Sequence, residues 1–445
     1  MAAARVWRLA GACVLGLCAL SAVAGTRAVP APDWAAGYDA SQMIVVAVAN
    51  KPDPQPGAGA TPRGYDTLPD YAGGDRGIAL AKRLSADYAL HELSAWVIEP
   101  LRLRCMVFAL PPASDRAELL ARLQRDKRVR IAQPLQEFNT FGATVAGANP
   151  ASAQAPPKAA YNDPYLGLQH NFAAIAAAGA QRATLGSGVR IALIDTGVDA
   201  AHPDLHGRIA EQRDFVGSGT SSAERHGTEV AGVISAVANN KLGIVGVAPA
   251  AQLLAYRACW ALPPPASGAR CNSYTLALAL GAALASDARI INLSLGGPAD
   301  PLLEQLVAEA IARGVLVVGA VPPDRRLDGF PAVVPGVVAV DAAEQTPSDA
   351  RVLRAPGRDI LTLEPGGHFD YASGSSLATA QVSGALALLL ELKPRESAAV
   401  LTTLLLDSQH GKAAIDICQA VAALRVASPP VCDGDSAVPA TGKGA

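Results

Sequence analysis

Hydrophobic residues in the later two thirds of the chain form short β-branched runs that alternate with alanine-rich stretches. Runs that are apolar on both faces are typical of strands buried in a parallel sheet, and the stretches between them predict helices on both sides of it. We expect such strands at residues 189–195, 252–258, 289–295, 314–320 and 336–341. The pattern therefore predicts an α/β fold, a doubly wound parallel sheet with helices on both faces, over residues 161–426.

The hydrophobic pattern is different in the first third of the chain. It predicts strands at 43–49, 101–111 and 130–138, and helices at 77–90 and 114–129. Mixed elements of this kind indicate a small α+β domain within residues 25–141. Residues 142–160 are rich in glycine, alanine and proline without periodicity, which predicts a flexible linker where processing occurs. Residues 427–445 predict a flexible tail.

Residues 1–24 have the features of a secretory signal peptide. Arg5 and Arg8 precede an apolar stretch, and Ala22-Val23-Ala24 provides a cleavage site of small residues. A membrane anchor is the alternative, but the apolar stretch is short for that role. We therefore expect a secreted or periplasmic protein without membrane contact after signal cleavage.

The composition limits the partners and the redox compartment. Half of the 445 residues are hydrophobic and 17% are charged, which allows a large core. The formal net charge of −2 gives no reason to expect nucleic acid as a partner. In an oxidising compartment, Cys259 with Cys271 and Cys418 with Cys432 are candidates for two local disulfides, and Cys105 is left as a buried thiol.

Three polar residues stand where chemistry is expected. Asp195 ends the first predicted sheet strand, His226 opens a helix of small residues, and Ser376 begins a long apolar helix. Each has a structural alternative, since an aspartate can cap a turn and a serine can cap a helix. Together they fit nucleophilic catalysis, in which an imidazole accepts the serine proton and a carboxylate orients the imidazole. An aspartic peptidase is disfavoured because the chain has no second Asp-Thr-Gly sequence.

The segments around these residues resemble the subtilisin-like serine peptidases, the subtilases. IALIDTGVDAAHPDL, HGTEVAGVI and GSSLATAQVSGALAL match the three active-site segments of that family, and GIVGVAPAAQL, INLSLGGP and APGRDIL match its other landmarks. The resemblance covers about residues 161–420 and implies a subtilisin-like fold with Asp195, His226 and Ser376 as the triad. It implies a serine endopeptidase that hydrolyses peptides or proteins through an acyl-enzyme intermediate.

The resemblance also implies roles for other parts of the chain. Residues 25–141 are similar to the ferredoxin-like propeptide of the family, which inhibits the enzyme and assists its folding before removal. The substrate cleft would be lined by Ser294, Leu295, Gly296 and Gly297. The substrate peptide would pair with their backbone as an added strand. Asp204 and Asn240 resemble the family's calcium ligands, so a structural calcium ion is a candidate, whereas catalysis requires no cofactor.

The chain departs from the family after the strand at 314–320. The family carries Ala-Gly-Asn there, and the asparagine side chain donates a hydrogen bond to the oxyanion. Here Pro322 and Pro323 take the Gly and Asn positions, and Asp324 follows. Proline has no donor, and losing one oxyanion donor costs about 10²–10³ in rate in subtilisin. We therefore expect a slow enzyme; the alternative is a catalytically impaired pseudopeptidase that binds peptides or acts as a scaffold.

Overall fold

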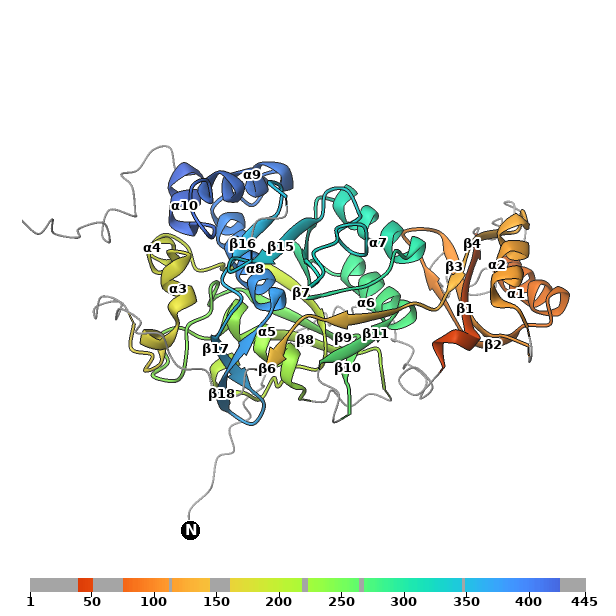
Figure 1. Ribbon diagram of the computed structural model, residues 1–445, viewed down its shortest axis with the longest axis horizontal. Coiled ribbons are helices and arrows are strands. Elements are labelled where there is room, and N and C mark those ends of the chain that lie inside the picture. Colours follow the sequence, from red (N-terminus) through yellow and green to blue (C-terminus); the bar gives the residue numbers. More distant parts are fainter. Residues whose placement is uncertain are drawn as a thin grey trace, which may run out of the picture.

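The computed structural model of the chain describes residues 39–50, 75–111, 114–144, 161–217, 223–263, 268–345 and 349–424. The predicted signal peptide, the predicted tail and most of the predicted linker lie outside these residues. The described part forms a small N-terminal unit and a larger α/β unit, which Figure 1 shows next to each other along the long axis of the molecule.

A seven-stranded parallel sheet forms the centre of the larger unit, in the order β16-β15-β14-β12-β7-β9-β8. Its strands are β7 (Arg190–Asp195), β8 (Ile209–Asp214), β9 (Gln252–Arg257), β12 (Ile290–Leu293), β14 (Leu316–Ala320), β15 (Val338–Ala342) and β16 (Leu353–Ala355). The strands predicted from the sequence are the central ones of this sheet, so the predicted parallel α/β fold is confirmed. The hydrophobic pattern misses the edge strands because β8 is largely polar and β16 is only 3 residues long.

Helices cover both faces of this sheet (Figure 1). They are α3 (His170–Ala174), α4 (Ala177–Gln181), α5 (Arg225–Ser235), α6 (Ser273–Ala285), α7 (Pro301–Ala312), α8 (Ser375–Leu392), α9 (Ala398–Ser408) and α10 (Ile417–Leu424), with short 3-10 helices η3 (Leu166–Leu168) and η4 (Pro203–Leu205). Alternate residues of β7 face opposite cores: Ile191 packs with residues of α5 and α8, whereas Ala192 packs with residues of α6 and α7. The central strand is therefore apolar on both faces, as its sequence predicts.

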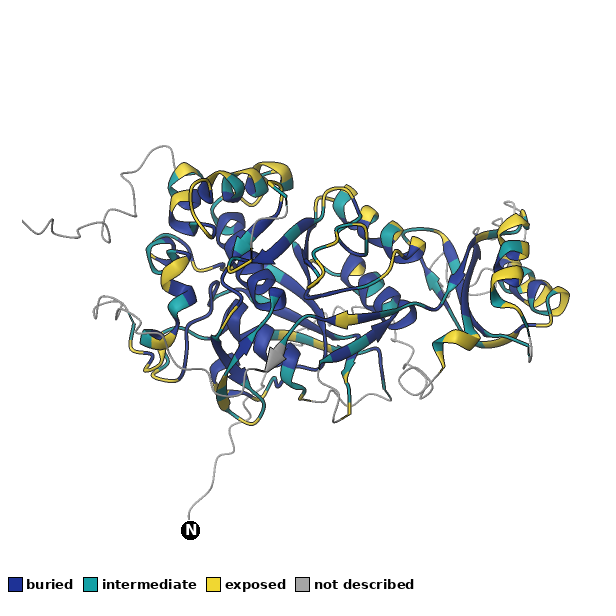
Figure 2. Cartoon of the chain, in the orientation of Figure 1, coloured by how far each residue is buried: buried dark blue, intermediate teal, exposed yellow. Residues whose placement is uncertain are grey.

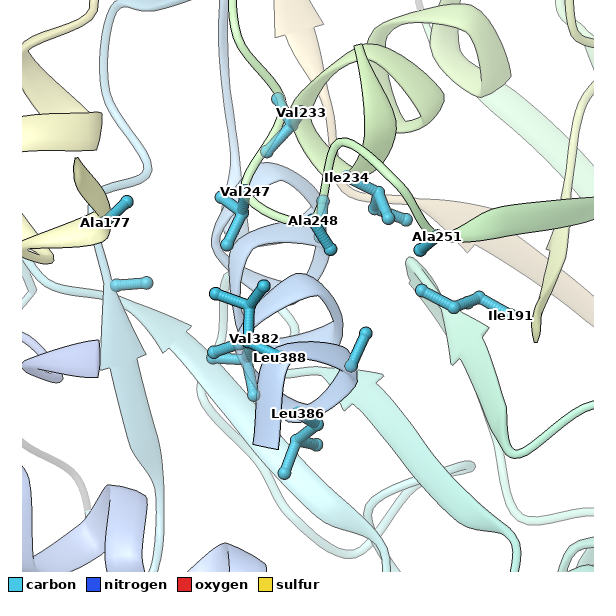
Figure 3. Packing of buried hydrophobic residues seen from close by; sticks show 14 of the residues in the cluster. Ala177, Ile191, Val233, Ile234, Val247, Ala248, Ala251, Val382, Leu386 and Leu388 are labelled. Atoms are coloured by element: carbon cyan, nitrogen blue, oxygen red, sulfur yellow. The ribbon is translucent and has the colours of Figure 1, made fainter. Parts of the chain in front are cut away.

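Helix α8 is the centre of the first core. Figure 3 shows Val382, Leu386 and Leu388 of α8 in the same apolar cluster as Val233 and Ile234 of α5, with Val247 and Ala248 between Val382 and the α5 residues. Of the described helices, α8 is the one that is long and apolar enough to cross a membrane, but 89% of its apolar window is buried inside the protein. Its apolar character is therefore explained by its position in the core, which Figure 2 shows as a dark, buried element.

The N-terminal unit has a βαββαβ order. It consists of η2 (Ala40–Gln42), β1 (Met43–Ala49), α1 (Asp75–Asp87), β2 (His91–Ile98), β3 (Leu103–Ala109), α2 (Arg116–Arg125) and β4 (Val129–Pro134). The four strands form an antiparallel sheet in the order β2-β3-β1-β4, which is the ferredoxin-like arrangement. Strand β2 is not predicted from the sequence, and the strand expected at 130–138 is divided between β4 and a later strand.

The two faces of this small sheet pack against different partners. Ile44 and Val46 face the unit's own helices α1 and α2. Val45 faces the other way and belongs to the core that contains α6 and α7 of the larger unit. At this interface the rings of Trp96 and Tyr274 meet edge to face, with centroids 4.9 Å apart. The N-terminal unit is thus attached to the larger unit by a shared apolar core.

Two smaller antiparallel sheets connect the units. One has the order β10-β11-β5-β13 and the other β17-β18-β6. Their strands are β5 (Glu137–Thr140), β6 (Ala143–Thr144), β10 (Cys259–Ala261), β11 (Ala269–Asn272), β13 (Leu295–Gly296), β17 (Ile360–Glu364) and β18 (His368–Ser373). The predicted linker 142–160 therefore begins with residues that form a strand, because β6 pairs with β18.

The cysteines agree with the predicted pairing where the structure describes them. Cys259 and Cys271 form a disulfide that joins β10 to β11. Cys105 is a buried free thiol, and burial raises its pKa far above the ordinary value. Cys418 is buried in α10, but Cys432 lies outside the described residues, so their pairing stays a prediction.

Candidate active site

Asp195 and His226 meet at the carboxyl end of the central strand. Asp195 is the last residue of β7, and His226 lies in the first turn of α5. His226 Nδ1 lies 2.6 Å from Asp195 Oδ1, which also accepts a hydrogen bond from the Thr196 N–H at 2.7 Å. The Gly227 N–H donates to Thr196 Oγ1 at 2.8 Å and fixes the start of α5 against the strand. Sheet and helix thus hold the imidazole in one orientation.

The environment of His226 acts on its pKa in two directions. Burial of the ring lowers the pKa, because a charged imidazolium is poorly solvated there. The negative charge of Asp195 and its hydrogen bond outweigh that effect, and the pKa of His226 lies above its ordinary value. Asp195 therefore stabilises the imidazolium that forms when His226 accepts a proton.

Ser376 lies in the first turn of α8 and is fully buried. Its Oγ donates to the Ser294 carbonyl oxygen at 2.9 Å, and Ser294 Oγ donates to the Ser376 carbonyl oxygen at 3.1 Å. Asn292 Nδ2 in turn donates to Ser294 Oγ at 2.9 Å. His226 Nε2 has no hydrogen-bond partner among the described residues. Ser376 and His226 are therefore not hydrogen-bonded to each other. A segment of the same chain contacts both side chains instead.

That segment begins with β5, which lies between β11 and β13 in one of the small antiparallel sheets. On one side it pairs with β13, with Asn139 opposite Gly296 and Thr140 opposite Leu295. On the other side it pairs with β11, where Phe138 lies opposite Cys271. Of the predicted substrate-binding residues 294–297, Leu295 and Gly296 thus pair with an added strand, and that strand belongs to the same chain. Gly297 pairs with Phe330 instead.

Phe141 and Gly142 follow β5 and contact the predicted triad. The Phe141 N–H donates to Ser376 Oγ at 3.2 Å. A Cβ atom built on Gly142 would lie 2.9 Å from His226 Nε2, so the backbone of Gly142 lies directly beside the imidazole. The peptide bond between these two residues is therefore next to both the predicted nucleophile, Ser376, and the predicted base, His226.

The segment leaves the site along β18. Ala143 lies opposite Ser373, and Thr144 lies opposite Ala372. Gly374, which follows Ser373, has φ +150° and is so close to the segment that a Cβ atom would lie 1.8 Å from the Phe141 carbonyl oxygen. Glycine is therefore required at position 374 by the close approach and by its left-handed backbone. Residues 137–144 are held on both sides of the Phe141–Gly142 bond.

Comparison with known proteins agrees with this geometry. Residues 186–420, more than half of the chain, match the family model described as the subtilase family. The chain belongs to the subtilase family. The match includes the three residues of the predicted triad, and it begins after the N-terminal unit and the bound segment.

Curated relatives are similar over about half of the chain. An intracellular serine protease of Paenibacillus polymyxa is 39% identical over 230 residues, which cover 47% of this chain and 68% of the relative. Subtilisin E of Bacillus subtilis is 34% identical over 227 residues, which cover 47% of this chain and 57% of the relative. Thermitase of Thermoactinomyces vulgaris is 35% identical over 243 residues, which cover 51% of this chain and 84% of the relative.

A solved structure is similar over more of the chain. Fervidolysin from Fervidobacterium pennivorans, described as a keratinolytic enzyme related to subtilisin, aligns with a TM-score of 0.67 and 20% sequence identity. The alignment covers 85% of this chain and 60% of that one. It supports the subtilase fold.

The position at which the family carries its oxyanion asparagine lies just after the end of β14. Ser375 Oγ donates to the Val321 carbonyl oxygen at 2.7 Å, which fixes the end of that strand against α8. Pro322 and Pro323 follow and line a cavity of about 400 Å³ together with Ser375. Asp324 does not line this cavity; its Oδ1 accepts from the Arg326 N–H at 3.2 Å on the exposed surface. Neither predicted oxyanion position thus provides a donor in this geometry.

The two predicted calcium ligands lie together but bond to each other. Asn240 Nδ2 donates to Asp204 Oδ1 at 2.7 Å, and the Ile244 N–H donates to Asp204 Oδ2 at 3.0 Å. Asn240 Oδ1 accepts from the Leu242 N–H at 2.8 Å. The described residues contain no group of three or more His, Cys, Asp or Glu side chains arranged to hold a metal. In this arrangement the two side chains hydrogen-bond to each other and to the backbone of residues 242–244, and the calcium ion stays a prediction.

Arg225, the neighbour of His226 on α5, lies among three carboxylates. Its Nε donates to Glu229 Oε1 at 2.8 Å, and its Nη2 contacts Glu364 and, at 3.1 Å, Asp370. Burial raises the pKa of Glu364 to about 7, although the charge of Arg225 acts in the opposite direction. The folded protein therefore binds a proton on Glu364 that the unfolded chain releases at lower pH.

This difference predicts a pH-dependent stability. Between the ordinary pKa of a glutamate and about 7, the native state keeps a proton on Glu364 that the unfolded chain has lost. The contribution of Glu364 to the free energy of unfolding therefore falls as the pH rises through this interval. Glu364→Gln, made in a Ser376→Ala background that lacks the predicted nucleophile, is expected to make the free energy of unfolding in urea less dependent on pH between pH 4 and pH 8. Glu309→Gln, at an exposed ion pair on α7, is the control and should leave the slope unchanged.

The sequence predicts the three triad residues but does not predict the segment of the chain that lies across them. No local pattern indicates that residues 137–144 pair with β11, β13 and β18, because these strands are distant in the chain. The one available signal is the pair of aromatic residues in FNTF at 138–141, the only local apolar anchors in an otherwise polar stretch.

Proposed function

We propose that this subtilase is a serine endopeptidase made as a self-inhibited precursor. The observation that carries the proposal is the position of residues 137–144, which cross the site as a substrate peptide would. Asp195, His226 and Ser376 act as the triad, and the N-terminal unit acts as the propeptide that holds the segment in place. The family relationship supports peptide or protein substrates.

The reaction follows from the contacts at the Phe141–Gly142 bond. Ser376 Oγ attacks the Phe141 carbonyl carbon while its proton passes to His226 Nε2, and the carbonyl electron pair moves onto oxygen. When the tetrahedral intermediate collapses, the bond to the Gly142 nitrogen breaks and His226 returns the proton to that nitrogen. Water then hydrolyses the acyl-enzyme by the same steps. Asp195 holds the imidazole and stabilises its charged form throughout.

The same contacts favour Phe141–Gly142 as the processing bond. Phe138 is fully buried between β11 and β13, and its ring meets that of Phe330 edge to face with centroids 5.6 Å apart. The Phe141 ring packs on Gly296, where a Cβ atom would lie 2.9 Å from two ring carbons. The site therefore accepts one aromatic side chain immediately before the cleaved bond and a second one three positions before the first. We expect the same preference in external substrates.

Other features support inhibition and export. Gln133 Oε1 of the N-terminal unit accepts from the Leu302 N–H at the start of α7 at 3.1 Å, and Ser94 Oγ lies 3.0 Å from Tyr274 Oη. These contacts would keep the N-terminal unit on the enzyme after cleavage, as an inhibitor. The disulfide between Cys259 and Cys271 fits an oxidising compartment, which supports a secreted or periplasmic location.

N-terminal sequencing and active-site labelling test the proposal. The wild-type chain is expected to yield a product that begins at Gly142 and that reacts with a fluorophosphonate probe. Ser376→Ala should remain uncleaved and unlabelled. A wild-type chain that stays intact and is not labelled would contradict the proposal and would favour a peptide-binding pseudopeptidase.

A further inference from the structure

The turn after β14 contains an arginine in an unusual conformation. The Arg325 N–H donates to the Pro322 carbonyl oxygen at 2.8 Å, which closes a turn over residues 322–325. Arg325 has φ +62°, in the left-handed region that residues with side chains seldom adopt. A glycine or an asparagine would be usual at such a position, so an arginine in this strained conformation next to the site suggests a role for its side chain.

The turn separates the charged side chains between two cavities beside the bound segment. Arg325 lines the cavity of about 400 Å³ that also contains Phe141, Gly142 and Ser375. Asp324 and Arg326, its neighbours in sequence, line a second cavity of about 590 Å³, which shares Phe141 with the first and is also lined by Gly296 and Gly297. Because of the left-handed backbone, Arg325 thus lies on the side of the scissile peptide and of the start of α8, apart from both neighbours.

A buried carboxylate holds Arg325 in this cavity. Arg325 Nε lies 3.5 Å from Asp341 Oδ2, and Asp341 is 5% exposed at the end of β15. Asp341 Oδ1 accepts from the Ala342 N–H at 2.8 Å, which fixes the carboxylate itself. A guanidinium has five N–H donors on three nitrogens, so an ion pair at one nitrogen is compatible with donation from another.

We propose that Arg325 provides the oxyanion donor that an asparagine provides in other subtilases. The proposal rests on the serine endopeptidase function proposed above. When Ser376 Oγ bonds to the substrate carbonyl carbon and its proton moves to His226, the carbonyl oxygen becomes an anion beside this cavity. The guanidinium donates to that oxygen, together with the backbone N–H of Ser376. A cationic donor forms a stronger hydrogen bond to an oxyanion than a neutral amide does.

Arg325→Gly is the main test, because glycine adopts the left-handed conformation readily and the turn should fold. In Ser376-dependent hydrolysis of a peptide with phenylalanine before the scissile bond, kcat is expected to fall by about 10²–10³ with little change in KM. Added guanidinium ion should restore part of kcat, and a peptide boronic acid, which forms a tetrahedral adduct with serine, should bind more weakly. A purely structural role for Arg325 would allow no rescue by guanidinium. Arg351→Met, an exposed arginine paired with Asp349, is the control and should leave kcat unchanged.

A second variant separates the donor from the rest of the turn. Pro323→Asn combined with Arg325→Gly places the family's donor at its usual position and is expected to recover at least about tenfold in kcat. A kcat for Arg325→Gly within about threefold of wild type would overturn the proposal for Arg325, while Ser376-dependent hydrolysis would still support the endopeptidase. A large loss without rescue by guanidinium or by Pro323→Asn would also overturn it. If the wild type shows no Ser376-dependent hydrolysis, the proposed function itself fails.

Discussion

Replacing Asp195 with asparagine is expected to lower kcat for peptide hydrolysis by about 10⁴-fold. Asp195 Oδ1 accepts a hydrogen bond from the His226 Nδ1–H, and the Thr196 N–H holds that oxygen in place. An asparagine in the same position can donate its amide N–H to Nδ1 instead. The ring would then carry its proton on Nε2, and His226 could no longer accept a proton from Ser376.

The same substitution should change the pH dependence. His226 must be neutral to act as a base, so activity falls as the pH drops below its pKa, which lies above the ordinary value. Removal of the Asp195 charge leaves burial as the main effect, and burial lowers the pKa. The acid limb of kcat for Asp195→Asn, which reports the substrate-occupied site, should therefore move to lower pH while the maximum rate falls.

Steady-state kinetics from pH 5 to pH 9 measure both effects. Asp287→Asn, at an exposed ion pair with Arg190, is a suitable control because it removes a carboxylate far from the site. It should reproduce the wild-type profile. A kcat for Asp195→Asn within about tenfold of wild type would contradict the triad assignment.

The core of the fold is predictable because burial on two faces leaves a strong hydrophobic pattern. In the strand at 290–293, Ile290 packs into one core and Ile291 and Leu293 pack into the other, so its apolar sequence pattern indicates its place. The edge strand β8 contains Glu211 and Arg213 on a partly exposed face, and no such pattern distinguishes it from a loop. Strands at the edge of a sheet have fewer neighbours, and their sequences are less restricted for that reason.

The site is predictable only where chemistry restricts the residue types. Asp195, His226 and Ser376 stand in segments that few other functions would require, and the structure brings Asp195 and His226 into contact. The side on which Arg325 lies could not be predicted, since it depends on a left-handed backbone that arginine does not favour. The glycine-rich composition around Gly142 indicates a linker, whereas the structure uses that glycine for a close approach to the imidazole.

That close approach leads to the second large effect, in the precursor. Gly142→Ala is expected to slow cleavage of the Phe141–Gly142 bond by about 10- to 100-fold, because overpacking a buried contact costs about 1–3 kcal/mol. A Cβ atom at position 142 would lie 2.5 Å from His226 Cδ2 and 2.9 Å from Nε2, so either the segment or the imidazole must move. Either movement separates the leaving nitrogen from the base that protonates it.

A time course of precursor cleavage, followed on gels and by N-terminal sequencing, measures this effect. Gly167→Ala is the matched control, because a Cβ atom there meets no atom within 4 Å, and its precursor should mature at the wild-type rate. Once formed, the Gly142→Ala enzyme should hydrolyse added peptides with the wild-type kcat, since residue 142 is then the new N-terminus. Normal cleavage of Gly142→Ala at the same bond would mean that the segment does not meet His226 in this register. If cleavage of the Gly142→Ala precursor is slow and the mature enzyme has the wild-type kcat, the slow cleavage results from the poorer fit of residues 137–144 in the site.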